Sequence, residues 1–234
     1  MTRRSRFGLL AAACLLARCA APPEPEPGEQ ATPVDSNVEI VFTLELAQEV
    51  YWDSDWGDPP QIAIWLRDKR GGAVRTVMVT HRTGRGDWEG KPQCPVSLPY
   101  WALAYNEETG TEGAPTWEEP AADGITRATP QQELTERIAV PAGSEWAYFI
   151  EINCSGDFND WHPSFSDEGM KDDYGNGQPS IVYRGELLAA SGTATRPRLI
   201  GRTHQHVAAS KLVVEMDSIT TARELFRRIQ VVCE

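Results

Sequence analysis

A two-residue alternation of apolar and polar side chains at 38–46 constrains the fold of this chain most strongly. Successive side chains of a β-strand point to opposite faces, so this pattern predicts a strand with one buried face and one exposed face. Glu39, Thr43 and Glu45 lie on the polar face. The apolar face carries Val38, Ile40, Phe42, Leu44 and Leu46.

A second alternation predicts a β-hairpin. Ile62, Ile64 and Leu66 share one face, and Trp65 lies on the other. The sequence DKRGG at 68–72 provides turn chemistry, because glycine adopts positive φ without strain. A β-branched run at 74–81 then returns. We therefore expect two antiparallel strands joined by this turn.

Later segments extend the same pattern and set the fold class. Strands are predicted at 145–154, 180–188, 211–216 and 230–233, and one helix at 220–228 with Asp217 and Ser218 as possible N-caps. Residues 82–130 are too long for a structureless loop, so packed irregular structure or short helices are expected there. These elements predict a mainly β protein, an immunoglobulin-like antiparallel β-sandwich with long loops and one short C-terminal helix.

The N-terminus has the pattern of an export signal. Arg3, Arg4 and Arg6 precede an apolar run at 7–17, which is too short to span a bilayer as a helix. The sequence LARC at 16–19 resembles a bacterial lipobox, in which the cysteine is lipidated, with Arg18 at a position that normally holds a small residue. Cys19 is the predicted lipidation site, and Cys14 is the alternative.

Three regions follow from this reading of the chain. Residues 1–19 are predicted to be the signal peptide, 20–37 a tether rich in proline and glutamate, and 38–234 a single β-sandwich domain. The lipid would anchor the protein to a membrane on the periplasmic side or at the cell surface of a bacterial envelope.

The charge balance and the motifs limit the function classes. Lysine and arginine total 22 against 34 aspartate and glutamate, a formal charge of −12, which argues against nucleic acid as a partner. The sequence contains no HExxH, GxSxG or P-loop motif. We therefore expect a non-catalytic binding or structural domain that contacts an envelope protein or a ligand through loops at 82–130 and 155–178.

Tryptophan is abundant, with eight copies. Trp52 and Trp56 flank Asp53 and Asp55, and Trp161 lies in a predicted loop. Aromatic faces beside carboxylates can bind sugars or cations, although such side chains also fasten long loops to a sandwich.

The cysteines beyond the signal are Cys94, Cys154 and Cys233. Disulfides persist in an export compartment, so one bridge and one remaining thiol are expected. The spacing does not choose among the three pairings, and the oligomeric state is equally open.

The segment DGITRAT at 123–129 is the sharpest candidate for a modification. It is similar to the motif of exported proteins that receive FMN on a threonine through a phosphoester bond. The resemblance implies Thr129 as the acceptor and Asp123 as the preceding acid, with Arg127 where that motif has glycine. A flavin-carrying redox protein is therefore the alternative function, and a capped turn that uses Thr126 and Thr129 is the structural explanation.

An acidic loop supplies a candidate calcium site at Asp157, Asn159 and Asp160. Calcium binds six to eight oxygen atoms, which carboxylates and amides at such spacing can provide. A solvated surface loop is the competing interpretation. His204 and His206 would share one face of a strand, as in two-point metal sites, but no third ligand is evident. No cofactor is required by these patterns.

Four segments together resemble the bacterial domain of unknown function family 2271, a family of predicted periplasmic proteins. They are IAIWLRD at 62–68 with VRT at 74–76, DGITRATP at 123–130, FIEIN at 149–153 through GQPSIVY at 177–183, and ITTA at 219–222 through IQV at 229–231. The resemblance covers roughly 38–232. It implies an exported β-rich domain and brings no established activity.

Overall fold

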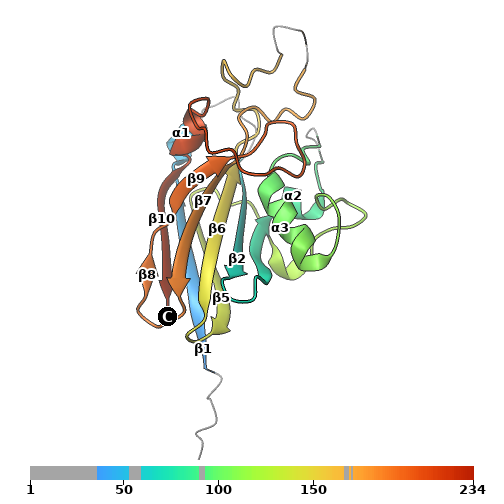
Figure 1. Cartoon of the computed structure of the whole chain (residues 1–234). Helices are drawn as coiled ribbons and strands as arrows, with labels where there is room; N and C mark the ends of the chain where they lie inside the picture. Colours follow the sequence, from blue (N-terminus) through green and yellow to red (C-terminus); the bar gives the residue numbers. More distant parts are fainter. Residues whose placement is uncertain (1–35, 53–58, 90–92, 166–168, 170) are drawn as a thin grey trace, which may run out of the picture. The chain divides into compact units, whose positions relative to one another are not determined.

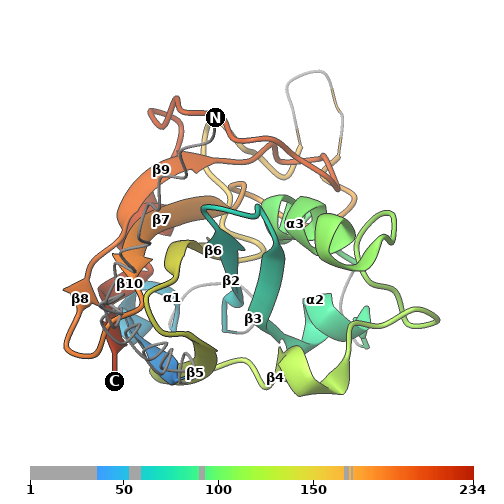
Figure 2. The same cartoon turned by 60° about the horizontal axis from the view of Figure 1, so that its bottom comes forward.

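The structure is a computed structural model that describes residues 36–52, 59–89, 93–165, 169 and 171–234. These residues belong to one compact unit (Figures 1 and 2). The predicted signal peptide, both of its cysteines and most of the tether lie outside the described residues, as do Asp53, Asp55 and Trp56. Among the described residues, no helix is long and apolar enough to cross a membrane.

Two β-sheets form the body of this unit. The first has the strand order β5-β1-β10-β8, and all of its pairs are antiparallel. The second has the order β4-β3-β2-β6-β7-β9 and is antiparallel except for the β3–β4 pair. The prediction of a mainly β sandwich is confirmed.

The strands of the first sheet are β1 (Asn37–Leu46), β5 (Glu133–Pro141), β8 (Ala194–Thr195) and β10 (Phe226–Cys233). Those of the second are β2 (Gln61–Asp68), β3 (Val74–Thr80), β4 (Thr126–Arg127), β6 (Glu145–Asn153), β7 (Ile181–Leu188) and β9 (Arg198–Arg202). The helices are α1 (Gln48–Tyr51), α2 (His81–Arg85) and α3 (Pro99–Thr109), with 3-10 turns η1 (Asp123–Ile125) and η2 (Thr221–Glu224).

The main core lies between the two sheets, as the alternating patterns predict. Side chains from the apolar face of β1 pack with those from β2 and β6 in one cluster. Phe42 of β1 meets Tyr148 of β6 edge to face, with ring centroids 5.7 Å apart. Burial of these alternating side chains is the main source of stability in a sandwich of this kind.

A second apolar cluster covers the outer face of the larger sheet. Trp101 of α3 is fully buried there, and Trp65 of β2 stacks on Phe149 of β6 at 5.2 Å. Figure 2 shows α2 and α3 beside β3. The expectation of short helices within 82–130 is therefore confirmed by α3.

Several predicted boundaries differ from the structure. The hairpin is present as β2–β3, with a register shift between Ile64 and Trp65. The C-terminal helix is shorter than predicted, a single 3-10 turn, because pairing with β1 draws Phe226 and the following residues into β10. The strand predicted at 211–216 is reduced to one bridge between Arg202 and Val213, and β5 was not predicted.

The expected disulfide is not formed. Cys94, Cys154 and Cys233 are all buried free thiols. Cys154 follows the end of β6, whereas Cys233 pairs with Ile40 near the start of β1, at the opposite end of the sandwich. Burial raises the pKa of the Cys94 thiol to about 12 and also raises the pKa of Cys154, so both thiols are neutral at physiological pH.

The strands place the long loops at one end of the sandwich. The described chain enters β1 at Asn37, near the 142–144 turn that leads into β6. The loop after β6 lies at the opposite end, seen at the top of Figure 1. This end, with the loop residues 155–165 and 171–178, is called the loop end below.

Candidate binding site at the loop end

A buried carboxylate organises the start of the loop after β6. Both Asp157 carboxylate oxygens lie 2.7 Å from the Thr221 hydroxyl, which comes from η2. The Gln178 side chain donates to the same Thr221 hydroxyl at 2.8 Å. Burial raises the pKa of Asp157, and the hydrogen bonds from Thr221 and Gln178 act against this rise. The loop is thus joined to the segment before β10.

Asp172 organises the returning half of the loop. Its Oδ2 accepts hydrogen bonds from the Gly177 backbone amide at 2.9 Å and from Gln205 Nε2 at 3.1 Å. Its Oδ1 accepts the Tyr174 amide at 3.2 Å. Asn176 adds a bond from its amide to the Gln205 carbonyl oxygen at 2.9 Å. These contacts fix the loop against the segment that follows β9.

His162 links the segment that follows β9 to the segment that precedes η2. Its Nδ1 lies 3.2 Å from Gln205 Oε1 and its Nε2 lies 3.2 Å from the Ser218 hydroxyl. Burial lowers the pKa of this histidine, which favours the neutral ring. His162 is therefore a structural member of the loop network.

The predicted calcium residues have separate roles. Asp157 is engaged with Thr221, and the Asn159 side chain accepts the Trp161 and His162 amides at 3.1 and 2.8 Å while donating to the Ser218 carbonyl. Asp160 is exposed. Within the described part of the chain, no three histidine, cysteine, aspartate or glutamate side chains are grouped to hold a metal ion.

The two histidines of the predicted pair, His204 and His206, make different contacts. His204 is exposed, and its backbone amide donates to the Ser210 hydroxyl at 3.0 Å. His206 Nδ1 lies 3.7 Å from Asp172 Oδ1. His206 thus contributes to the surface around Asp172.

A hollow of about 460 Å³ opens between these loop segments. We call it the loop hollow. Trp161, Pro163 and Tyr174 provide apolar walls, and Trp161 is 60% exposed. The complete lining is Trp161, Pro163, Lys171, Asp172, Asp173, Tyr174, Gln205 and His206. Aromatic walls with a mixed charged rim suit the binding of another molecule.

The Asp123–Thr129 segment lies away from this hollow, alongside β3. Asp123 begins η1 and forms an ion pair with Arg85. Thr126 donates to the Ala122 carbonyl at 3.0 Å, as the capped-turn interpretation expects. Thr129 is half-buried in the stretch between β4 and β5. Modification of Thr129 remains a prediction.

Arg127 is built into the local structure at the position where the flavin motif has glycine. Its Nε donates to Glu136 at 2.9 Å, and its Nη1 donates to the Gly124 carbonyl at 2.9 Å. The side chain therefore fastens the segment to β5, a role that glycine could not take.

Sequence reasoning named Trp161 and the acidic loop but missed the partners that shape the hollow. Lys171, Tyr174 and Gln205 come from two segments that meet only in the folded chain. The concentration of aromatic residues between 158 and 174 was a signal for Tyr174 only.

No family model matches the chain, and comparisons with curated proteins and with solved structures found no similar one.

Proposed function

We propose that this chain is an exported, lipid-anchored protein of the bacterial cell envelope. In this proposal its β-sandwich is a non-catalytic domain that binds an envelope protein through the loop hollow. Support for the location comes from the basic and apolar N-terminus that ends in Cys19. The resemblance to the family of predicted periplasmic proteins supports the same location.

The exposure of large aromatic side chains in one loop carries the binding proposal. Trp161 and Phe165 are each 60% exposed, and Phe158 and Tyr174 are also exposed. Exposed aromatic groups of this kind mark interaction surfaces, where tryptophan and tyrosine contribute most of the binding energy. The hydrogen bonds of Asp157 and Asp172 hold the described residues 155–165 and 171–178 of this loop against neighbouring segments, which reduces the ordering cost of binding for those residues.

The net charge of the chain indicates which kind of partner surface it would attract. Residues 1–18 contain four arginines and no acids, so the chain from Cys19 onward has 18 basic and 34 acidic residues, a formal charge of −16. A partner with a neutral or basic surface is favoured, and electrostatic attraction would speed its association.

The position of the strands is compatible with anchoring. Because the chain enters β1 at the end opposite the loop end, a lipid joined through the tether would leave the loop hollow free to contact a partner. This arrangement requires no rearrangement of the sandwich.

A capture experiment with a matched control tests the binding proposal. The domain is immobilised and mixed with detergent-solubilised envelope extract, and the retained proteins are compared for the wild type, Trp161→Ala and Trp117→Ala. Trp117 is 67% exposed and lies outside the loop hollow, so it controls for loss of an exposed tryptophan. We expect one envelope protein to be retained by the wild type and Trp117→Ala and lost with Trp161→Ala. Equal retention by all three, or no retained protein, would contradict the proposal.

A further inference from the structure

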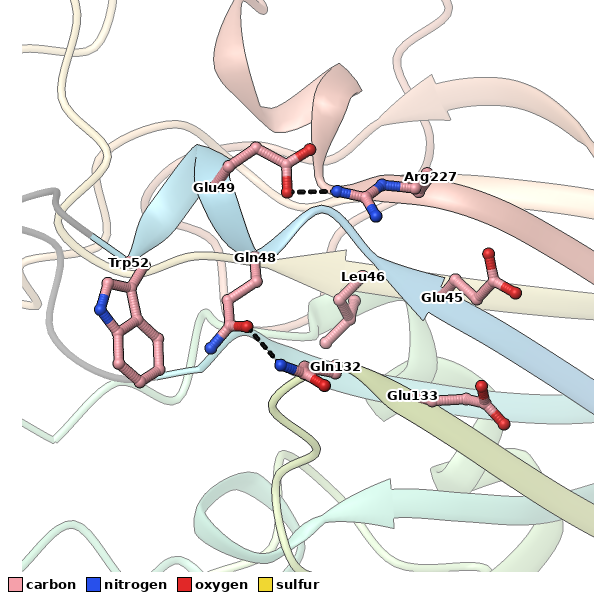
Figure 3. A pocket seen from close by; sticks show the side chains of 8 residues that line it. All are labelled: Glu45, Leu46, Gln48, Glu49, Trp52, Gln132, Glu133 and Arg227. Carbon is pink, nitrogen blue, oxygen red and sulfur yellow. Dashed lines mark hydrogen bonds and ion pairs between the residues drawn. The ribbon is translucent and has the colours of Figure 1, made fainter.

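A second hollow, separate from the loop hollow, lies beside α1. Figure 3 shows Trp52 at one end of this hollow and Glu45 with Glu133 at the other. Its volume is about 700 Å³. We call it the Trp52 hollow, and its lining consists of Glu45, Leu46, Gln48, Glu49, Trp52, Gln132, Glu133 and Arg227.

Trp52 is held in position without contributing its ring to the core. It follows α1 directly, and its backbone amide donates to the Gln48 carbonyl at 2.9 Å. The preceding residue, Tyr51, is buried in the main core and fixes the short helix. The Trp52 side chain is nevertheless 60% exposed. An exposed indole face on a backbone that is held in this way is a platform on which a flat apolar surface can stack.

Planar polar groups surround this platform. Gln132 Nε2 donates to Gln48 Oε1 at 2.7 Å. Among the described residues, the Gln48 side-chain amide hydrogens and the Gln132 side-chain oxygen have no further hydrogen-bond partner, so they can bond to a ligand. Arg227 pairs with Glu49 at 2.6 Å along another wall. Sugar rings combine apolar C–H faces with hydroxyl groups that both donate and accept, and these walls match both properties.

The charge of the hollow selects among sugars. Three carboxylates face one guanidinium, so the lining carries a formal charge of −2. Glu45 and Glu133 are direct register partners of β1 and β5, a placement of like charges that is unfavourable for the sheet itself. Glu45 pairs with Arg228, whereas Glu133 makes no ion pair with any described residue. Acidic sugars would be repelled here.

We propose that the Trp52 hollow binds a saccharide that carries no negative charge. The sugar ring stacks on Trp52, its hydroxyl groups bond to Gln48 and Gln132, and Glu133 accepts a hydroxyl or an ammonium group. The site uses none of the loop-hollow residues, so it holds independently of the partner proposed above.

Calorimetric titration of the full domain tests this site. The probes are short oligomers of glucose, of N-acetylglucosamine, of glucosamine and of galacturonic acid. We expect at least one of the three non-acidic oligomers to bind and the galacturonic acid oligomer not to bind. Failure of all three non-acidic oligomers, or equal binding of the acidic one, would overturn the proposal.

Variants assign the binding to the hollow. Trp52→Ala should weaken saccharide binding about tenfold through the loss of stacking, and its exposed side chain can be removed without opening the core. Circular dichroism and the melting temperature verify the fold of this variant. Trp117→Ala and Trp161→Ala should leave saccharide affinity unchanged, which separates this site from the loop hollow. Unchanged affinity with Trp52→Ala would place the binding elsewhere and refute the assignment.

Discussion

Glu151 carries an ionisable side chain in an environment that excludes water. It lies in β6 and is fully buried on the outer face of the larger sheet. Its carboxylate accepts the Trp101 amide at 2.6 Å, the Tyr100 amide at 3.2 Å and the Ser180 hydroxyl at 2.5 Å. It therefore caps the first turn of α3 from another element, since Leu98 at the N-cap provides no side-chain bond.

This burial predicts a pH dependence of stability. Desolvation raises the pKa of Glu151 from 4.5 to about 7, although its three hydrogen bonds favour the charged form. The folded state then holds this proton more tightly than the unfolded state. The stabilisation is complete below the unfolded pKa and is lost as the pH rises through the folded one. Its full size is about 3 kcal/mol.

Glu151→Gln removes this titration, and urea unfolding at pH 5 and pH 8 measures the effect. As the pH rises from 5 to 8, we expect the free energy of unfolding of the wild type to fall relative to that of the variant. His162 has the opposite effect, since its lowered pKa makes stability fall as the pH decreases. It is present in both proteins and cancels in the comparison. Parallel pH profiles for the two proteins would show that Glu151 does not titrate in this range.

At the scale of elements, Trp101 is the largest fully buried side chain by which α3 packs on the sheet. Trp101 is fully buried and donates from Nε1 to the Thr76 hydroxyl at 3.2 Å. Arg67 of β2 holds the exposed side of the helix through two 2.7 Å bonds to Glu107. The buried Trp101 contact contributes far more to the free energy of unfolding than the exposed Arg67–Glu107 ion pair, because solvent screens the ion pair.

Trp101→Ala should lower the free energy of unfolding by about 3–5 kcal/mol, through lost apolar burial and the cavity that remains. Chemical denaturation measures this loss, and amide hydrogen exchange should accelerate in α3 more than in β1. The exposed Trp117→Ala serves as the control and should change stability by less than about 0.5 kcal/mol. A loss below about 1 kcal/mol with Trp101→Ala would show that α3 is not held by this side chain.

The strands that sequence reasoning could predict carry either an alternating apolar face or a nearly continuous apolar run. Each of β1, β2, β3 and β6 satisfies one of these conditions. β5 does not, because Glu133, Glu136 and Arg137 dominate a strand that only one other strand of its sheet pairs with. Spacing at Leu225 and Ile229 fits a helix as well as a buried strand, and pairing with β1 decides for β10.

At the scale of the whole molecule, the loop end could be predicted only in outline. The sequence indicated an acidic, aromatic loop after β6, but the hollow depends on contacts such as Asp172–Gln205 and Asp157–Thr221 between distant segments. Local spacing holds no information about such pairs. The calcium interpretation groups Asp157, Asn159 and Asp160 by their spacing alone, and it stays a prediction.

One measurement tests both the proposed location and the proposed non-catalytic role. It is the intact mass of the mature protein extracted from the native membrane. We predict a chain that starts at Cys19 and carries the added mass of a diacylglyceryl group and of one further acyl chain. We predict no FMN on the peptide that contains Thr129. The alternative of a flavin-carrying redox protein predicts the mass of one FMN on that peptide. A chain that retains Met1, or a flavin on Thr129, would contradict the account of a lipid-anchored binding domain.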